Sequence, residues 1–261
     1  GISSIVLSSL MAGLVAILAT VFIERLGGAI GGIITLPTTI VPASIGIWIG
    51  VNGDTVSFTA AMSMVPIGML LNVLFLGSWR ILPRYLDNKF PEKYLLIAVA
   101  IFSVIFWLVT AGVSTVMVEE ISNFIDPIYI GFIAVLFAFI LGFFAVSKGG
   151  EAPSGSNSVS LYSIMMRGLA AGGAIGLSVW IAALGLPFIS GVVSVFPAIF
   201  LTTMVSLWLA QGRAVPVGAT GPMMLGSSSV SIYALICILL FPLYGVWVGS
   251  IVCWVIVSNF L

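Results

Sequence analysis

The apolar positions of this chain form long uninterrupted runs and do not alternate with polar positions. Several runs continue for about 20 residues, the length of helix that crosses the hydrocarbon core of a bilayer. A membrane-spanning β-strand would instead show an apolar residue at every second position. The pattern therefore predicts an all-α integral membrane protein built from transmembrane helices.

Nine helices are predicted, most of them joined by short polar connections. Their expected bounds are 2–22, 28–51, 57–76, 94–118, 128–146, 161–184, 188–210, 217–240 and 243–260. The longest polar connection is Trp79–Lys93, and a Gly/Ser/Pro-rich linker at 147–160 is typical of a flexible joint. The least defined boundary lies near Phe241–Pro242.

Composition supports the same class. Of 261 residues, 61% are hydrophobic and 6% are charged, and the mean hydropathy is +1.31. Soluble domains carry about 25% charged residues, so this chain cannot cover a water-facing surface. Zero net charge gives no reason to expect a nucleic-acid partner. The expected surroundings are a lipid bilayer, and a homo-oligomer is compatible with the sequence.

Charges segregate under the nine-helix layout. One face receives seven basic residues, Arg25, Arg80, Arg84, Lys89, Lys93, Lys148 and Arg213. The connections on the other face contain no Lys or Arg and include Asp54, Glu119, Glu120 and Asp126. The positive-inside rule then predicts that the basic face is cytoplasmic and the N-terminus lies outside. The sequence does not indicate which membrane is involved.

An internal repeat is visible in the spacing of a few residues. Gly31, Pro37 and Trp48 recur 160 positions later as Gly191, Pro197 and Trp208, and Met11–Leu14 resembles Met166–Leu169. Because the repeat unit holds five helices, equivalent helices cross the membrane in opposite directions. This predicts an inverted repeat, with a first copy at 1–146, a linker at 147–160 and a second copy at 161–261. The helices divide five plus four, or five plus five if a tenth helix completes the second copy.

Two predicted helices carry prolines that interrupt backbone hydrogen bonding. Pro37 and Pro42 follow four glycines in the second helix, and Pro197 is the repeat mate of Pro37 in the seventh. Interrupted helices at corresponding positions mark binding sites in many secondary transporters. The candidate substrate-binding residues are Pro37, Thr38, Thr39, Ser44, Asn72, Pro197, Thr202, Thr203 and Thr220. A simple proline kink, with small residues serving helix packing, is the alternative interpretation.

A charged pair is a further candidate feature. Arg167 is expected about 9 Å inside the cytoplasmic end of its helix, since it lies six residues after the helix start. Glu24 lies at the cytoplasmic end of the repeat-related helix, so a gating ion pair between the two halves is geometrically reasonable. The alternative is that Arg167 extends its side chain to the interface.

Several kinds of chemistry find no support in the sequence. The chain has no histidine and no acidic ladder through its helices, so we expect no metal site and no cofactor. Cys237 and Cys253 lie in apolar runs and are interpreted as packed thiols in preference to a disulfide or metal pair. No phosphate-binding loop and no nucleophile with a base are evident, so we do not expect an enzyme.

The leading functional prediction is a secondary transporter or facilitator for a small solute or ion. The overall plan resembles that of secondary transporters with five-helix inverted repeats, which is an architectural analogy. One alternative is a channel built on the same repeat. The other is a non-transporting membrane scaffold subunit whose glycines serve assembly only.

Overall fold

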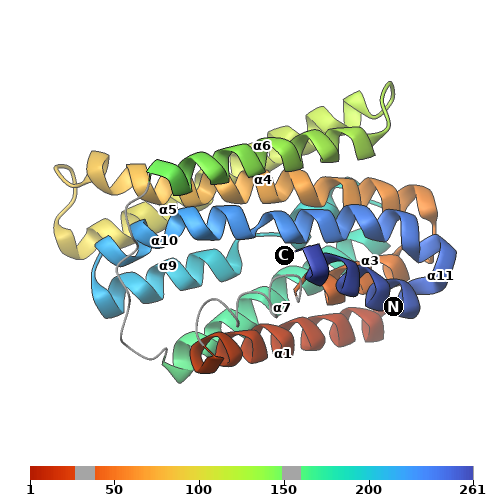
Figure 1. Cartoon of the computed structure of the whole chain (residues 1–261), viewed down its shortest axis with the longest axis horizontal. Coiled ribbons are helices and arrows are strands. Elements are labelled where there is room, and N and C mark those ends of the chain that lie inside the picture. The colour runs from red at the N-terminus through yellow and green to blue at the C-terminus, as the bar shows by residue number, and fades with distance from the viewer. Residues whose placement is uncertain (27–38, 149–159, 261) are drawn as a thin grey trace.

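The computed structural model describes residues 1–26, 39–148 and 160–260, and in these ranges every regular element is a helix (Figure 1). The helices are α1 Ile2–Leu26, α3 Ile40–Gly50, α4 Thr55–Leu86, α5 Glu92–Ile121, α6 Pro127–Lys148, α7 Leu161–Ala183, α8 Pro187–Ser194, α9 Ala198–Gln211, α10 Ala214–Gly226 and α11 Ser228–Phe260.

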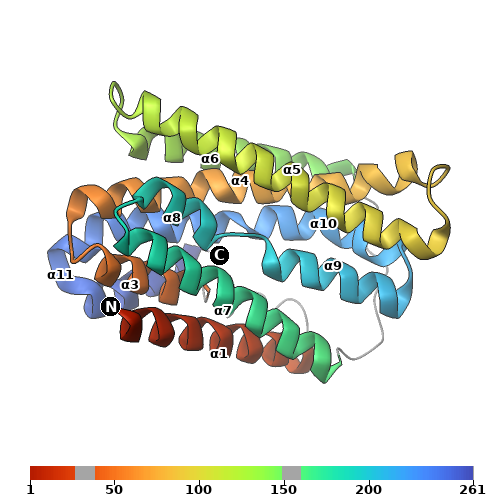
Figure 2. The ribbon, with the colours of Figure 1, turned by 180° about the vertical axis from the view of Figure 1, so that it is seen from behind.

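Helix α4 is the centre of the bundle. Helices α5 and α6 form a layer on one side of it, and α1, α3 and α7 lie on the far side (Figures 1 and 2). In the most apolar 18-residue stretch of α4, 83% is buried inside the protein, compared with 28% in α5 and in α6. The core is therefore assembled around α4, whereas α5 and α6 leave most of their apolar surface facing outward.

Six helical segments of the described chain are long and apolar enough to cross a membrane. They are Thr55–Leu86, Glu92–Ile121, Pro127–Lys148, Leu161–Ala183, Pro187–Gln211 and Met223–Asn259. The outward side chains of α5 and α6 include exposed Ile101, Phe102, Phe132 and Phe143. An apolar outer surface of this kind needs hydrocarbon around it, because water would disfavour it. The predicted all-α fold is confirmed, and six helices that could span a membrane are consistent with the predicted membrane protein.

Helix α4 is longer than predicted. It continues to Leu86, so the first half of the predicted connection Trp79–Lys93 is helical. Trp79, Pro83 and Leu86 are buried, whereas Arg84 and Tyr85 on the opposite side are exposed. The polar residues that suggested a loop are thus one face of an amphipathic helix end.

Two predicted helices are interrupted. The predicted helix 188–210 is divided into α8 and α9 by residues 195–197. The predicted helix 217–240 is divided at Ser227, where α10 ends and α11 begins. The predicted helix 28–51 is represented by α3 alone, because its first half falls outside the described residues.

The last predicted boundary, at Phe241–Pro242, is wrong by a few residues. Pro242 lies within helical backbone, and the chain turns back at Gly245, whose φ of 76° and ψ of 166° are not helical. Glycine adopts this positive φ without the steric cost that a side chain would bring. The hydroxyl of Tyr233, before the turn, lies 3.3 Å from the carbonyl oxygen of Ser250, after the turn. The two parts of α11 therefore pack side by side.

Helices α1 and α7 cross at small residues. A Cβ atom added at Gly172 would lie 2.8 Å from the Ser9 carbonyl oxygen, closer than real Cβ contacts allow. Gly13 and Gly168 meet reciprocally, since a Cβ added at either one would lie 3.2 Å from the carbonyl oxygen of the other. Such contacts bring two backbones together in the way that small residues do at membrane helix crossings.

Gly172 and its neighbour Gly173 provide a direct test of this crossing. No atom lies within 4 Å of a Cβ added at Gly173. We expect Gly172→Ala to lower the melting temperature of the purified protein, because overpacking costs about 1 to 3 kcal/mol. Gly173→Ala should be neutral or stabilising by up to about 1 kcal/mol, since alanine is the better helix former. Equal melting temperatures for the two variants would contradict the close α1–α7 crossing.

Candidate functional site

The break between α8 and α9 is the centre of the candidate site. Pro197 has no N–H to donate, so the helical hydrogen-bond pattern is interrupted there. The Phe196 amide donates to the Val193 carbonyl at 3.0 Å, and the Ala198 amide donates to the Phe196 carbonyl at 2.7 Å. Regular helix resumes at Ala198. The prediction of a disturbed helix at Pro197 is confirmed.

Asn72 binds the broken segment. This residue lies in the middle of α4 and is 2% exposed. Its side-chain nitrogen donates to the Val195 carbonyl oxygen at 2.9 Å, and the same nitrogen lies 3.5 Å from the Met69 sulfur. An uncharged amide therefore satisfies a carbonyl at the helix break, where hydrocarbon would offer no partner.

Helix α5 contributes a third residue to the hydrogen bonds at the break. The Trp107 indole N–H, from α5, donates to the Asn72 side-chain oxygen at 2.7 Å. The Trp107 ring also packs edge-to-face against Phe196, with 5.2 Å between ring centroids. The break is thus held by an amide–indole pair that joins α4, α5 and the α8–α9 segment.

The sequence prediction included Asn72 but missed Trp107 and Phe196. Tryptophan in membrane proteins is enriched at the interfaces, whereas Trp107 lies near the middle of a 30-residue helix. A buried indole N–H usually has a hydrogen-bond partner. A tryptophan in mid-span was therefore a signal for a polar neighbour, although the sequence alone could not identify that neighbour as Asn72.

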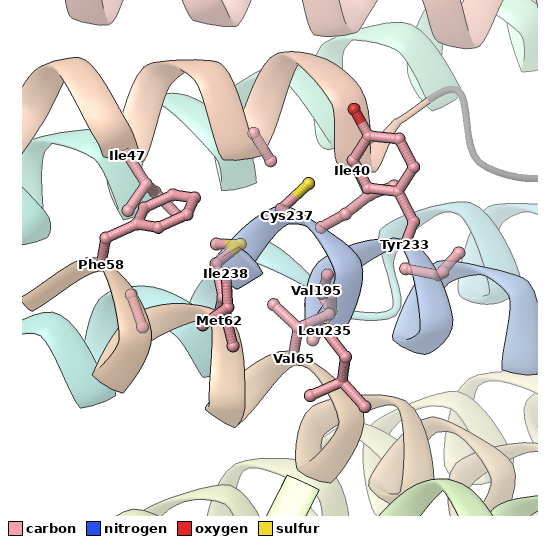
Figure 3. Close-up of a cluster of buried hydrophobic side chains, with 14 of the residues drawn as sticks. Ile40, Ile47, Phe58, Met62, Val65, Val195, Tyr233, Leu235, Cys237 and Ile238 are labelled. Atoms are coloured by element: carbon pink, nitrogen blue, oxygen red, sulfur yellow. The ribbon is translucent and has the colours of Figure 1, made fainter. Parts of the chain in front are cut away.

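Helix α3 approaches the same region. Its first residue, Ile40, belongs with Val195 and Tyr233 to one cluster of buried side chains (Figure 3). Thr39 precedes the helix and makes no side-chain capping bond. The predicted site residues Pro37 and Thr38 fall outside the residues that the structure describes. The beginning of α3 and the α8–α9 break therefore face one core.

Three of the six candidate hydroxyls bond to their own helices. Ser44, Thr202 and Thr220 donate to the carbonyls of Val41, Ala198 and Val217, at 2.9, 2.8 and 2.8 Å. Ser44 and Thr220 are fully buried, whereas Thr202 and Thr203 are half-buried. With their protons engaged, the first three hydroxyls present oxygen lone pairs, which can accept a hydrogen bond or coordinate a cation.

Many of the side chains packed around the break are apolar. Met62, Met69 and Tyr233 lie in the same cluster as Val195. Cys237 and Cys253 are buried there as free thiols. In the described part of the chain, no three His, Cys, Asp or Glu side chains come together as a metal site would require. The donors and acceptors near the break are therefore amide, indole, hydroxyl and carbonyl groups.

Arg167 lies on α7, which packs against both α8 and α9. It is 8% exposed, which argues against a guanidinium extended to the surface. One turn earlier, Ser163 lies 3.1 Å from Ser206 of α9. The Glu24 side chain is not among those described, so the gating pair stays a prediction. The double variant Glu24→Arg with Arg167→Glu tests this pair. If the pair forms, the charge exchange should restore function that either single substitution impairs.

Comparison of the chain with models of protein families, with curated proteins and with solved structures gives no match.

The amide at the break yields a stability prediction. Asn72→Leu keeps a side chain of similar size but leaves the Val195 carbonyl and the Trp107 N–H without their partner. We expect the free energy of unfolding in detergent to fall by about 1 to 2 kcal/mol. Ser103→Ala is the matched control, because this buried hydroxyl bonds only to the Ala100 carbonyl of its own helix, at 2.9 Å. Equal stability of the two variants would show that the Asn72 bonds contribute nothing.

Proposed function

We propose that this protein is a secondary transporter or facilitator for a small solute or ion. The observation that carries the proposal is the break between α8 and α9, where a buried amide holds the Val195 carbonyl. In secondary transporters, discontinuous helices supply backbone groups that replace water around the substrate. The proposed site lies where this break and the beginning of α3 face each other.

The packing of α1 against α7 supports the proposed inverted repeat. Gly13 and Gly168 occupy equivalent positions in the matching segments Met11–Leu14 and Met166–Leu169. These two glycines contact each other reciprocally across the α1–α7 crossing. A twofold relation between two halves produces such a contact, because each residue then meets its own equivalent.

The proposed arrangement has nine membrane passes, five in the first half and four in the second. In this arrangement α8 and α9 together make one pass. The turn at Gly245 divides α11, so that its first part completes the pass that begins with α10 and its second part makes the ninth pass. Helix α3 is the described end of the second pass.

The chemistry around the break favours a neutral polar solute or a monovalent cation. Carbonyl and hydroxyl oxygens can accept hydrogen bonds from a neutral solute, or replace part of the water shell of a cation. The side chains that bond at the break, Asn72 and Trp107, are uncharged. They offer no charge to compensate a multiply charged anion.

A carrier agrees with the packing better than a channel does. Apolar side chains, including Ile40, Met62 and Tyr233, fill the space between α3, α4 and α11 (Figure 3). A continuous pore would need a polar path through this core, whereas a carrier can open it from one face at a time. A scaffold without transport activity is the second alternative, and the small-residue crossing of α1 and α7 is the observation that favours it.

The proposed orientation places the basic end in the cytoplasm. The α4–α5 and α9–α10 turns lie at one end of the bundle, and the α3–α4 and α5–α6 turns lie at the other (Figure 1). At the first end, Arg213 and Asp87 form an ion pair of 2.7 Å that joins the two turns. The Asp87 carboxylate accepts a hydrogen bond from the Arg213 guanidinium and raises the pKa of Arg213. The positive-inside rule supports this assignment.

Uptake into proteoliposomes tests the function. Purified full-length protein should be screened with labelled neutral solutes and monovalent cations, with and without sodium and proton gradients. We expect saturable uptake above that of protein-free vesicles for at least one class. Non-saturable flux would indicate a channel, and the absence of flux for every compound would indicate the scaffold.

Threonine variants test the site once a substrate is found. Thr203→Val removes a half-buried hydroxyl close to the break and keeps the side-chain shape. If this hydroxyl binds substrate, the half-saturation concentration should rise about 5- to 150-fold, which corresponds to about 1 to 3 kcal/mol. Thr110→Val on α5 is the control, because its hydroxyl bonds within its own helix, to the Phe106 carbonyl at 2.8 Å. Equal half-saturation concentrations in both variants and the parent would exclude Thr203 from the site.

A further inference from the structure

A hollow of about 320 Å³ lies at the C-terminal end of α4, away from the candidate site. Its lining residues are Arg80, Ile81, Arg84 and Tyr85. They occupy the outward face of the helix end, opposite the buried Trp79, Pro83 and Leu86. None of these four residues belongs to the α8–α9 break.

The length of α4 places the hollow near the lipid headgroups. Its 32 residues make a helix of about 48 Å, which exceeds the ~30 Å hydrocarbon core and matches the bilayer with its headgroups. Arg80 lies six residues before the helix end, at a depth of about 9 Å from it. Tyr85 is 72% exposed and Ile81 is 55% exposed, as expected for side chains in contact with the bilayer interface.

The hollow carries uncompensated positive charge. The Arg80 guanidinium donates to the Ala145 carbonyl oxygen on α6 at 3.1 Å, which fixes its position and leaves other N–H groups available. Arg213 and Asp87 form the one ion pair among the described residues, so neither Arg80 nor Arg84 has a described carboxylate within 4 Å. Within the described part of the chain, these two guanidinium groups, one helical turn apart, lack an anionic partner.

We propose that this hollow binds the phosphate group of an anionic phospholipid. Guanidinium groups bind phosphate oxygens through paired hydrogen bonds, and basic side chains near the bilayer surface attract anionic headgroups. Ile81 provides an apolar contact for the beginning of the acyl chains beside the two arginines. A free phosphate ion shares the headgroup chemistry but gains nothing from Ile81 or from the neighbouring bilayer.

The test is native mass spectrometry of the full-length protein in detergent, with phosphatidylglycerol, phosphatidylcholine or sodium phosphate added. We expect the parent to retain phosphatidylglycerol at least fivefold more than phosphatidylcholine. Arg84→Gln should reduce this retention at least fivefold. This variant keeps the bond between Arg80 and Ala145, and its folded state is verified by size-exclusion chromatography.

A variant that loses more charge outside the hollow separates binding in the hollow from general electrostatic attraction. Lys89→Gln with Lys93→Gln removes two positive charges at the same end of the bundle but outside the hollow. This double variant should retain phosphatidylglycerol like the parent. Equal losses in the lysine and arginine variants, or no loss in Arg84→Gln, would overturn the proposal. Competition of millimolar sodium phosphate with the lipid at equal strength would also overturn it, by assigning the hollow to a free anion.

Discussion

The hydrocarbon core of a bilayer has no hydrogen-bonding groups, and this one constraint explains where polar groups occur in the bundle. Each backbone amide and carbonyl must find its partner inside the protein. The long helices meet the requirement by themselves. At the α8–α9 break they cannot, and there Asn72 of α4 donates to the Val195 carbonyl while Trp107 of α5 donates to the Asn72 side-chain oxygen. These hydrogen bonds hold the break at a defined position against α4 and α5.

The same constraint explains why the remaining charges lie where they do. Arg84, Asp87 and Arg213 are at the end of the bundle, where water and headgroups can solvate them. Arg167 is the exception among the described charges, because it lies within α7 and is largely buried. Because so little charge lies inside, the bundle depends on close packing between helix backbones. At the crossing of α1 and α7, Gly13 of α1 and Gly172 of α7 each bring the two backbones into short contact.

Much of this architecture could be predicted from the sequence, because hydrocarbon demands long apolar runs that are easily seen. Helices α5, α6 and α7 begin and end within a few residues of the predicted bounds. Of the residues that the sequence singled out, Pro197 and Asn72 both lie at the α8–α9 break, whereas Pro37 falls outside the described residues. The partner of Asn72 could not be predicted, since the bond to Trp107 joins residues 35 positions apart and depends on how α4 and α5 pack. The last turns of α4 were missed because an amphipathic helix end at the interface has the composition of a loop.

The functional proposal requires that the core around the break becomes accessible to water during transport. Thiol labelling of Thr203→Cys with a membrane-impermeant maleimide tests this requirement most directly. Cys237 and Cys253 lie in the same core and would label if it opens, so every variant is made with Cys237→Ala and Cys253→Ala. Variants Asp54→Cys and Arg84→Cys mark the two faces. We expect the face markers to label from opposite sides, and position 203 to label from one side or the other according to the imposed gradient. Protection of position 203 from both sides under every gradient, or labelling of both markers from the same side, would contradict the proposed transport site and its orientation.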